Sequence, residues 1–212
     1  MSATAEHPSN TPHELFGRIL CVTDRSTPGA EAARQAAVLA GPGAAIDLVS
    51  VAPERPPDHD LVVIGAGDTG FHLLDRAPGS VLLTRAPAGG SPFPESILVA
   101  VDGSDEAHAA ARLGAKLAAL HDATVALVAA PEHDAVHQNA LERDIAAVER
   151  ITGTRPVILD EYRAPVPSIL SAATSVEASV IVLGRRPGSP SPSISAEVAA
   201  AAPCSVLVVR AG

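Results

Sequence analysis

Short, unbroken apolar segments recur along the chain and alternate with longer amphipathic stretches. In the second half the apolar runs contain five to seven residues rich in Val, Leu and Ile: ILVAV (97–101), TVALVAA (124–130), VIVLG (180–184) and SVLVV (205–209). Runs of this kind are typical of strands covered on both faces, as in a parallel sheet. The pattern therefore predicts an α/β protein rather than an all-β or all-helical one.

The segments between these runs have helical periodicity and helix boundary residues. Ser104 precedes two acidic residues and an Ala/Leu-rich stretch, which is the pattern of a helix N-cap. Leu141, Ile145, Val148 and Ile151 share one helix face. We expect helices over about 104–120, 133–152, from 165 onward and over 193–202, with a further strand at 156–162.

The first half of the chain repeats the second in shortened form. Residues 19–40 match 97–118 at an offset of 78, with 10 of 22 positions identical. LVVIG (61–65) matches VIVLG at an offset of 119, and SVLLTRA (80–86) matches SVLVVRA (205–211) at 125. The offset grows by 41 residues, so the second half contains a block, near 132–174, that the first half lacks.

This repeat predicts the domain organisation. We expect a disordered polar tail at 1–15, a truncated domain at 16–86, a linker at 87–94 and a complete domain at 95–212. The complete domain reads βαβαβαβαβ and the truncated one βαβ–βαβ, so we expect two doubly wound parallel sheets.

Composition and charge exclude several classes of function. The chain has 15 Lys and Arg against 24 Asp and Glu, a net charge of −9, with no basic cluster, which disfavours nucleic acid and anionic membranes as partners. Cys21 and Cys204 form no disulfide framework or zinc motif and are interpreted as small buried apolar residues. With no signal-peptide pattern and no apolar run of bilayer length, we expect a cytoplasmic protein.

Three separated blocks of the second half occur in a characteristic order: ILVAVDGSDEA (97–107), PSILSAATSVEASVIVLG (167–184) and APCSVLVVR (202–210). They resemble the universal stress protein family, well over 97–210 and partially over 19–85. The resemblance implies a flavodoxin-like sheet of strand order 3-2-1-4-5, a cytoplasmic stress-response role, ATP or AMP binding in one subclass, and dimerisation through the last strand.

The last strand of each half would be an exposed apolar sheet edge, which favours association. We expect the two halves to cover each other's last strands as an internal pseudo-dimer, the alternative being two independent domains on a linker. A homodimer and an unidentified protein partner are further expectations.

A nucleotide site is expected where the strand order reverses, at the carboxyl ends of the first and fourth strands of the second half. Asp102, Gly103 and Gly184 lie there, and the resemblance places Asp102 at the ribose and adenine end and Ala129 near the adenine. Asp102 has an equally good interpretation as a helix cap that accepts hydrogen bonds from the backbone amides after it.

The phosphate-binding part of the site departs from the family pattern of spaced glycines. The loop RRPGSPSPS (185–193) is about five residues short and carries prolines, which lack amide donors. Gly188 is a candidate for a displaced glycine of that pattern. We expect Arg185 and Arg186 to be solvated, the alternative being that their charges bind phosphate in place of backbone amides. Ser193 is expected to cap a helix rather than bind phosphate. We therefore expect weak or lost ATP binding and no bound cofactor, with ATP or AMP as the alternative.

Other candidate chemistry is weaker. Residues 65–70 spell G-x-G-x-x-G but follow a late strand, so a Gly-rich turn is favoured over a dinucleotide fingerprint. His133 and His137 have the i, i+4 spacing of zinc ligands but no third ligand, so no metal is expected. No nucleophile motif is found. The sequence favours a non-enzymatic regulatory or interaction module with a degenerate nucleotide pocket, the alternative being an ATP/AMP-binding protein with slow hydrolysis.

Overall fold

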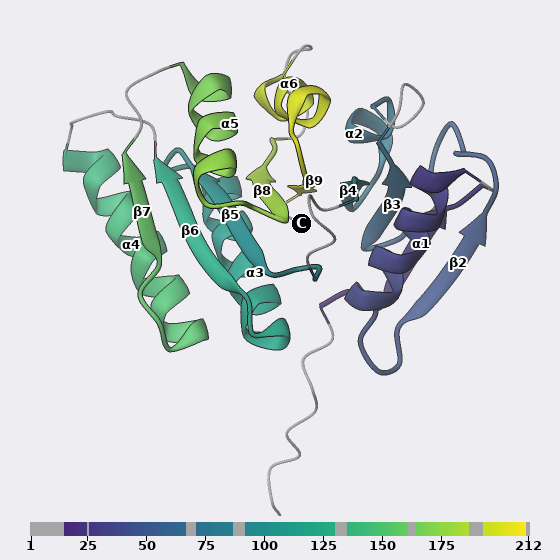
Figure 1. Ribbon diagram of the computed structural model, residues 1–212, viewed down its shortest axis with the longest axis horizontal. Helices are drawn as coiled ribbons and strands as arrows, with labels where there is room; N and C mark the ends of the chain where they lie inside the picture. The colour runs from purple at the N-terminus through teal and green to yellow at the C-terminus, as the bar shows by residue number, and fades with distance from the viewer. Residues whose placement is uncertain are drawn as a thin grey trace, which may run out of the picture.

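The computed structural model describes residues 15–24, 26–66, 71–86, 92–129, 135–160, 164–186 and 193–210. Within them strands and helices alternate along the chain, except that β3 directly follows β2 and β5 directly follows β4 (Figure 1). The first part contains β1 (Arg18–Val22), α1 (Thr27–Leu39), β2 (Ala45–Val49), β3 (Leu61–Gly65), α2 (Leu73–Arg76) and β4 (Ser80–Thr84). The second contains β5 (Ser96–Val101), α3 (Asp105–His121), β6 (Thr124–Ala129), α4 (Ala135–Thr152), β7 (Val157–Asp160), α5 (Pro165–Ser175), β8 (Val180–Gly184), α6 (Ile194–Ala201) and β9 (Ser205–Val209).

The described strands form one sheet in the order β2-β1-β3-β4-β9-β8-β5-β6-β7. Neighbouring strands are parallel except β4 and β9, which pair antiparallel with Leu82 opposite Leu207. The α/β fold class is confirmed, and β7-β6-β5-β8-β9 is the expected 3-2-1-4-5 order of the second half. The two sheets expected from the sequence are joined edge to edge through β4 and β9.

Helices cover both faces of the sheet (Figure 1). One core cluster packs α1, α3 and α4 against alternate strand residues such as Ile19, Val99 and Leu207. The other packs α2, α5 and α6 against the intervening residues, such as Leu98 and Val206. Side chains of successive strand residues point to opposite faces, so a strand buried on both faces must be apolar throughout, which explains the unbroken runs.

The helix boundaries follow from their capping residues. Ser26, Ser104 and Ser193 precede α1, α3 and α6, and each hydroxyl accepts a hydrogen bond from a backbone amide in the first turn. Such bonds satisfy amides that have no partner inside the helix. Gly153, with φ of 74°, follows the last turn of α4 and ends it as expected.

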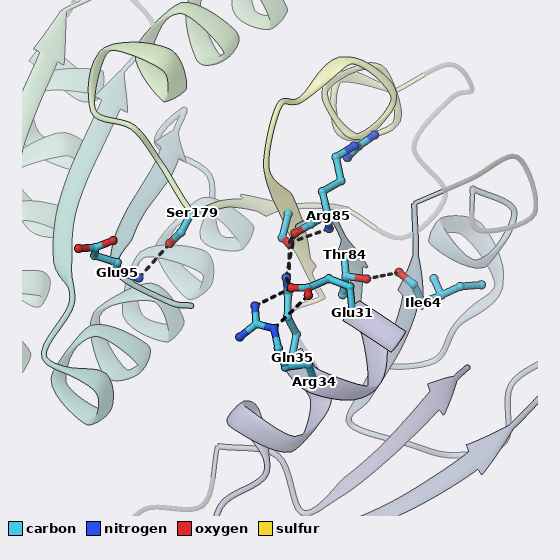
Figure 2. Close-up of polar contacts among 9 residues, drawn as sticks. Glu31, Arg34, Gln35, Ile64, Thr84, Arg85, Glu95 and Ser179 are labelled. Carbon is cyan, nitrogen blue, oxygen red and sulfur yellow. Dashed lines mark hydrogen bonds and ion pairs between the residues drawn. The ribbon is translucent and has the colours of Figure 1, made fainter. Parts of the chain in front are cut away.

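The junction between β4 and β9 is held by matched polar contacts from the two halves. The backbone amide of Arg85 donates to Ser205 Oγ at 3.0 Å, and that of Arg210 donates to Ser80 Oγ at 3.5 Å. Both serines and both arginines are related by the offset of 125 residues. Gln35 adds a buried link, since its side chain contacts the carbonyl of Arg85 and the hydroxyl of Ser205 (Figure 2).

The first half lacks counterparts of α4, β7 and α5, and β2 is consequently an outer strand of the sheet. Leu48 on β2 is 64% exposed. The loop that connects β2 to β3 is anchored by buried His59, whose Nε2 lies 2.8 Å from Asp47 Oδ2. The expected tail and most of the expected linker, residues 1–14 and 87–91, lie outside the described residues. Among the described helices, none has the length and apolar character needed to cross a bilayer.

Candidate functional site

A cavity of about 450 Å³ lies at the carboxyl ends of β5, β6 and β8. The order of the strands reverses between β5 and β8, and ligands of open α/β sheets bind at such points. The starts of α3, α5 and α6 form the other walls. The lining residues are Ala100, Val101, Asp102, Ser104, Glu106, Ala107, Val128, Ala129, Pro165, Ser168, Ile169, Leu183, Gly184, Arg185, Arg186, Ser193, Ile194 and Ser195.

Asp102 lies two residues before Ser104, the N-cap of α3, and also lines the cavity. Its Oδ1 accepts hydrogen bonds from the amide of Ser104 at 3.0 Å and from its hydroxyl at 2.6 Å. Asp24 makes the same two contacts with Ser26 in the first half, and the Ser26 hydroxyl lowers the pKa of the Asp24 carboxyl. The expected hydrogen bond from the Ser104 amide to Asp102 is therefore confirmed, the cap of the helix being Ser104 itself, and the exposed carboxylate of Asp102 lines the cavity wall.

Gly184 allows β8 to approach the first turn of α3. A Cβ at this position would lie 2.3 Å from the carbonyl carbon of Glu106, closer than any real Cβ contact. Gly65 at the end of β3 has the same role, since its Cβ would lie 2.6 Å from Pro28 Cβ at the start of α1. Gly103 has a φ of 80°, which glycine adopts readily, and it turns the chain from β5 into α3 without lining the cavity.

Arg185 is not solvated, and our expectation for it was wrong. Only 4% of its side chain is exposed, and its guanidinium forms an ion pair with Asp75 of α2. Nη1 also donates to Ser193 Oγ at 2.9 Å and to Ser195 Oγ at 3.2 Å. Burial of the charge is tolerated because a carboxylate and two hydroxyls surround it.

Arg186, the next residue, does face solvent. Its side chain is 68% exposed, with Nε 3.3 Å from Glu106 Oε2 at the rim of the cavity. Two adjacent arginines of one loop are thus in opposite environments, because Arg185 points into the molecule and Arg186 points out of it.

Ser193 caps α6, as expected. Its Oγ accepts from the amide of Ala196 at 3.3 Å and from Arg185. Residues 187–192 lie outside the described residues, so the expectations for Gly188 and for the proline-containing phosphate loop stay predictions. The described ends of this loop, Arg186 and Ser193, both line the cavity.

Ala129 and Ser168 are two further residues of the cavity wall. Ala129 ends β6 and lines the cavity where adenine contact is expected. Ser168, one turn into α5, was not singled out from the sequence. Its residue is 5% exposed, and its Oγ has no hydrogen-bond partner among the described residues. A lone hydroxyl on the apolar face of α5, beside Ile169, was the signal that could have found it.

The other candidates do not form a site. His133 and the side chain of His137 lie outside the described residues, and within the described ones no three His, Cys, Asp or Glu residues are grouped to hold a metal ion. Residues 67–70 of the G-x-G-x-x-G segment are likewise outside. Cys21 and Cys204 are buried free thiols, as expected, and burial raises the pKa of each to about 11.

Comparison with known proteins agrees with this arrangement. The model of the universal stress protein family matches residues 94–210, more than half of the chain. The chain belongs to the universal stress protein family. Among curated proteins, none matches it.

Solved universal stress proteins share the fold over almost the whole chain. One from Archaeoglobus fulgidus DSM 4304 has a TM-score of 0.74 at 13% identity and covers 95% of this chain and 99% of its own. One from Pseudomonas aeruginosa UCBPP-PA14 has a TM-score of 0.65 at 16% identity and covers 93% and 94%. A universal stress protein in complex with cAMP has a TM-score of 0.51 at 24% identity and covers 56% of this chain and 98% of its own.

Proposed function

We propose that this universal stress protein binds a purine mononucleotide of the AMP class in the cavity at β5, β6 and β8, and acts as a non-enzymatic regulatory module in the cytoplasm. The observation that carries the proposal is the 450 Å³ cavity at the point where the strand order reverses, with the exposed carboxylate of Asp102 and the buried Arg185 in its wall. Buried hydroxyls nearly always have a hydrogen-bond partner, and the Ser168 hydroxyl has none among the described residues, which favours rotation of this side chain toward a polar ligand atom in the cavity.

The walls of the cavity suit the parts of a nucleotide. Ala100, Val128, Ile169 and Leu183 offer apolar contact for a planar base. Asp102 offers a carboxylate for ribose hydroxyls, and Arg185 places a guanidinium at the wall for a phosphate. The volume lies in the range of small-molecule sites, about 300–1,000 Å³.

A single phosphate is favoured over three. Pro187 and Pro192 remove amide donors from the loop that joins β8 to α6, and a triphosphate depends on such donors. One family member of this fold was solved with cAMP, which supports a purine nucleotide with one phosphate as the ligand class. The protein is therefore proposed to sense a mononucleotide rather than to hydrolyse ATP.

Isothermal titration calorimetry with AMP, cAMP, ATP and adenosine tests the proposal. We expect AMP to bind more tightly than ATP, and Asp102→Ala and Ser168→Ala to weaken AMP binding. Ser171→Ala is the matched control, because Ser171 is on the same helix and does not line the cavity. At about 100 times its dissociation constant the ligand should stabilise the fold by about 2.7 kcal/mol. The absence of any heat or thermal shift with millimolar nucleotide would contradict the proposal.

A further inference from the structure

A charged cluster joins the two halves of the molecule beside the cavity. Arg185, which follows β8, forms its ion pair with Asp75 of α2, a residue 110 positions earlier in the chain. Arg210, which follows β9, donates through Nη2 to the carbonyl of Leu74 on the same short helix at 2.8 Å. One carboxylate from the first half thus lies near two guanidinium groups from the second.

The charges of this cluster do not balance. Burial and the charge of Arg185 lower the pKa of Arg210, and Asp75 opposes this shift. Among the described residues, Arg185 and Arg210 lie beside the single carboxylate of Asp75, which leaves an excess positive charge. Arg185 is almost completely buried, whereas the side chain of Asp75 is 52% exposed. The guanidinium is therefore fixed in the cavity wall, and the carboxylate is the partner that can move into solvent.

The cavity and the ion pair share the same guanidinium. Arg185 lines the cavity, and Asp75 does not. A phosphate monoester, like a carboxylate, accepts paired hydrogen bonds from a guanidinium group, and it carries a larger charge. A ligand phosphate that reaches Arg185 consequently competes with Asp75 for its N–H donors, while the uncharged parts of the ligand do not.

We propose that Asp75 is a specificity-determining residue of the cavity, supplied by the first half, and that it sets the affinity for phosphorylated ligands by competing with their phosphate for Arg185. The inference rests on the proposed function, because it assumes a nucleotide in the cavity. It assigns the shortened first half a role at the site of the second half. Release of Asp75 on ligand binding then breaks the ion pair between α2 and Arg185.

The test compares AMP with adenosine, which differ only in the phosphate. Calorimetry on Asp75→Asn should give an AMP affinity about tenfold higher than that of the unchanged chain, with adenosine affinity unchanged. Glu197→Gln is the control for loss of one negative charge, since Glu197 is exposed on α6 and does not line the cavity. It should leave both affinities as they are. Asp75→Ala repeats the test if the Asn variant does not fold.

A second measurement, hydrogen exchange, follows the effect of the ligand on α2 of the first half. Hydrogen exchange of the amides at 73–76 should become faster when AMP binds and stay the same with adenosine, because only AMP displaces Asp75. A purely structural ion pair would give a lower melting temperature in Asp75→Asn and the same ratio of AMP to adenosine affinity, and this would overturn the inference alone. Failure of the unchanged chain to bind either ligand would overturn the proposed function and the inference together.

Discussion

Arg85 and Arg210 make equivalent contacts in opposite directions across the junction of β4 and β9. Arg85 reaches the end of α6, where Nη2 donates to the carbonyl of Ala199 at 2.6 Å and Nη1 to that of Cys204 at 3.4 Å. Arg210 reaches the end of α2 and the carbonyl of Leu74. The last carbonyls of a helix have no partner inside it and carry partial negative charge, so a cation there is stabilising.

Replacing Arg85 by Met should therefore destabilise the protein measurably. Arg85→Met keeps most of the apolar stem but leaves the carbonyls at the end of α6 without their donor, and we expect a loss of about 1–3 kcal/mol in the free energy of unfolding. Arg155→Met is the control, since Arg155 is 59% exposed and lies 3.8 Å from Glu149, and it should cost less than about 0.5 kcal/mol. Urea unfolding of both variants measures the difference, and equal losses would contradict this interpretation.

Residues whose partners are close in sequence were predictable, and those with distant partners were not. Ser104 and Ser193 cap helices that begin at the next residue, so the local pattern was sufficient. Arg185 was expected in solvent because its loop is polar, but its partner Asp75 is on the other half of the molecule. Ser168 was missed because its local signal, a hydroxyl on the apolar face of α5, does not show that a cavity lies beside it or that it has no hydrogen-bond partner among the described residues.

Among the secondary-structure elements, the first helix of each half packs closely against the end of one strand, α1 against β3 and α3 against β8. Gly65 at the end of β3 meets Pro28 on α1, and Gly184 at the end of β8 meets Glu106 on α3. Pro28 and Glu106 are separated by 78 residues, the offset of the first repeat block. The packing of strand on helix is thus the same in both halves, although the helix residue differs.

This close packing predicts that Gly184→Ala is strongly destabilising. The added Cβ would lie 2.3 Å from the backbone of α3, so either β8 or α3 must shift, at a cost of about 1–3 kcal/mol. Gly17→Ala is the matched control, because the nearest atom to its Cβ would be Asp60 Oδ2 at 3.4 Å, an ordinary contact. Chemical denaturation should show a much larger loss for Gly184→Ala, and a similar effect of the two substitutions would refute the packing argument.

The strands and long helices followed from periodicity, because burial on both faces requires unbroken apolar runs. β7 is shorter than expected, Val157–Asp160 rather than 156–162, and residues 161–163 lie outside the described part. β2 departs from the pattern of the other strands, since Leu48, which pairs with Cys21 of β1, is exposed, whereas Leu127, which holds the same place on β6 opposite Val99 of β5, is buried. The missing block of the first half explains this exposure, because α4 packs over this face of β6 and β2 is followed directly by β3, with no counterpart of α4 among the described elements of the first half.

At the scale of the whole molecule, β4 protects an edge that the second half could not protect alone. All five residues of β9 are buried, and β9 lies between β8 and β4 in the sheet. Without β4, the amides and carbonyls of β9 would form an open, apolar edge, which favours pairing with another strand. The first half thus covers the edge of β9 and also supplies Asp75, the ion-pair partner of the Arg185 that lines the cavity.

A fragment of residues 92–212 should consequently pair with a second copy of itself through β9. In the chain, Leu82 lies opposite Leu207, with Val81 opposite Val208 and Leu83 opposite Val206. A second β9 in the place of β4 would put Leu207 opposite its own copy and Val206 opposite Val208, so the edge is complementary to itself. Light scattering should give a dimer for the fragment, with dissociation on dilution.

In the expected dimer of fragments, Leu207 lies on the two-fold axis opposite its own copy. Cross-linking at this position therefore checks the pairing of the two β9 strands. Opposite residues of antiparallel strands have Cα atoms about 4.5–5.5 Å apart, within the range that a disulfide spans. Leu207→Cys in the fragment should form an intermolecular disulfide under mild oxidation, whereas the same substitution in the 212-residue chain should not, because Leu82 occupies the opposite position. A fragment that stays monomeric at high concentration, or a chain that cross-links as readily as the fragment, would show that β4 does not protect this edge.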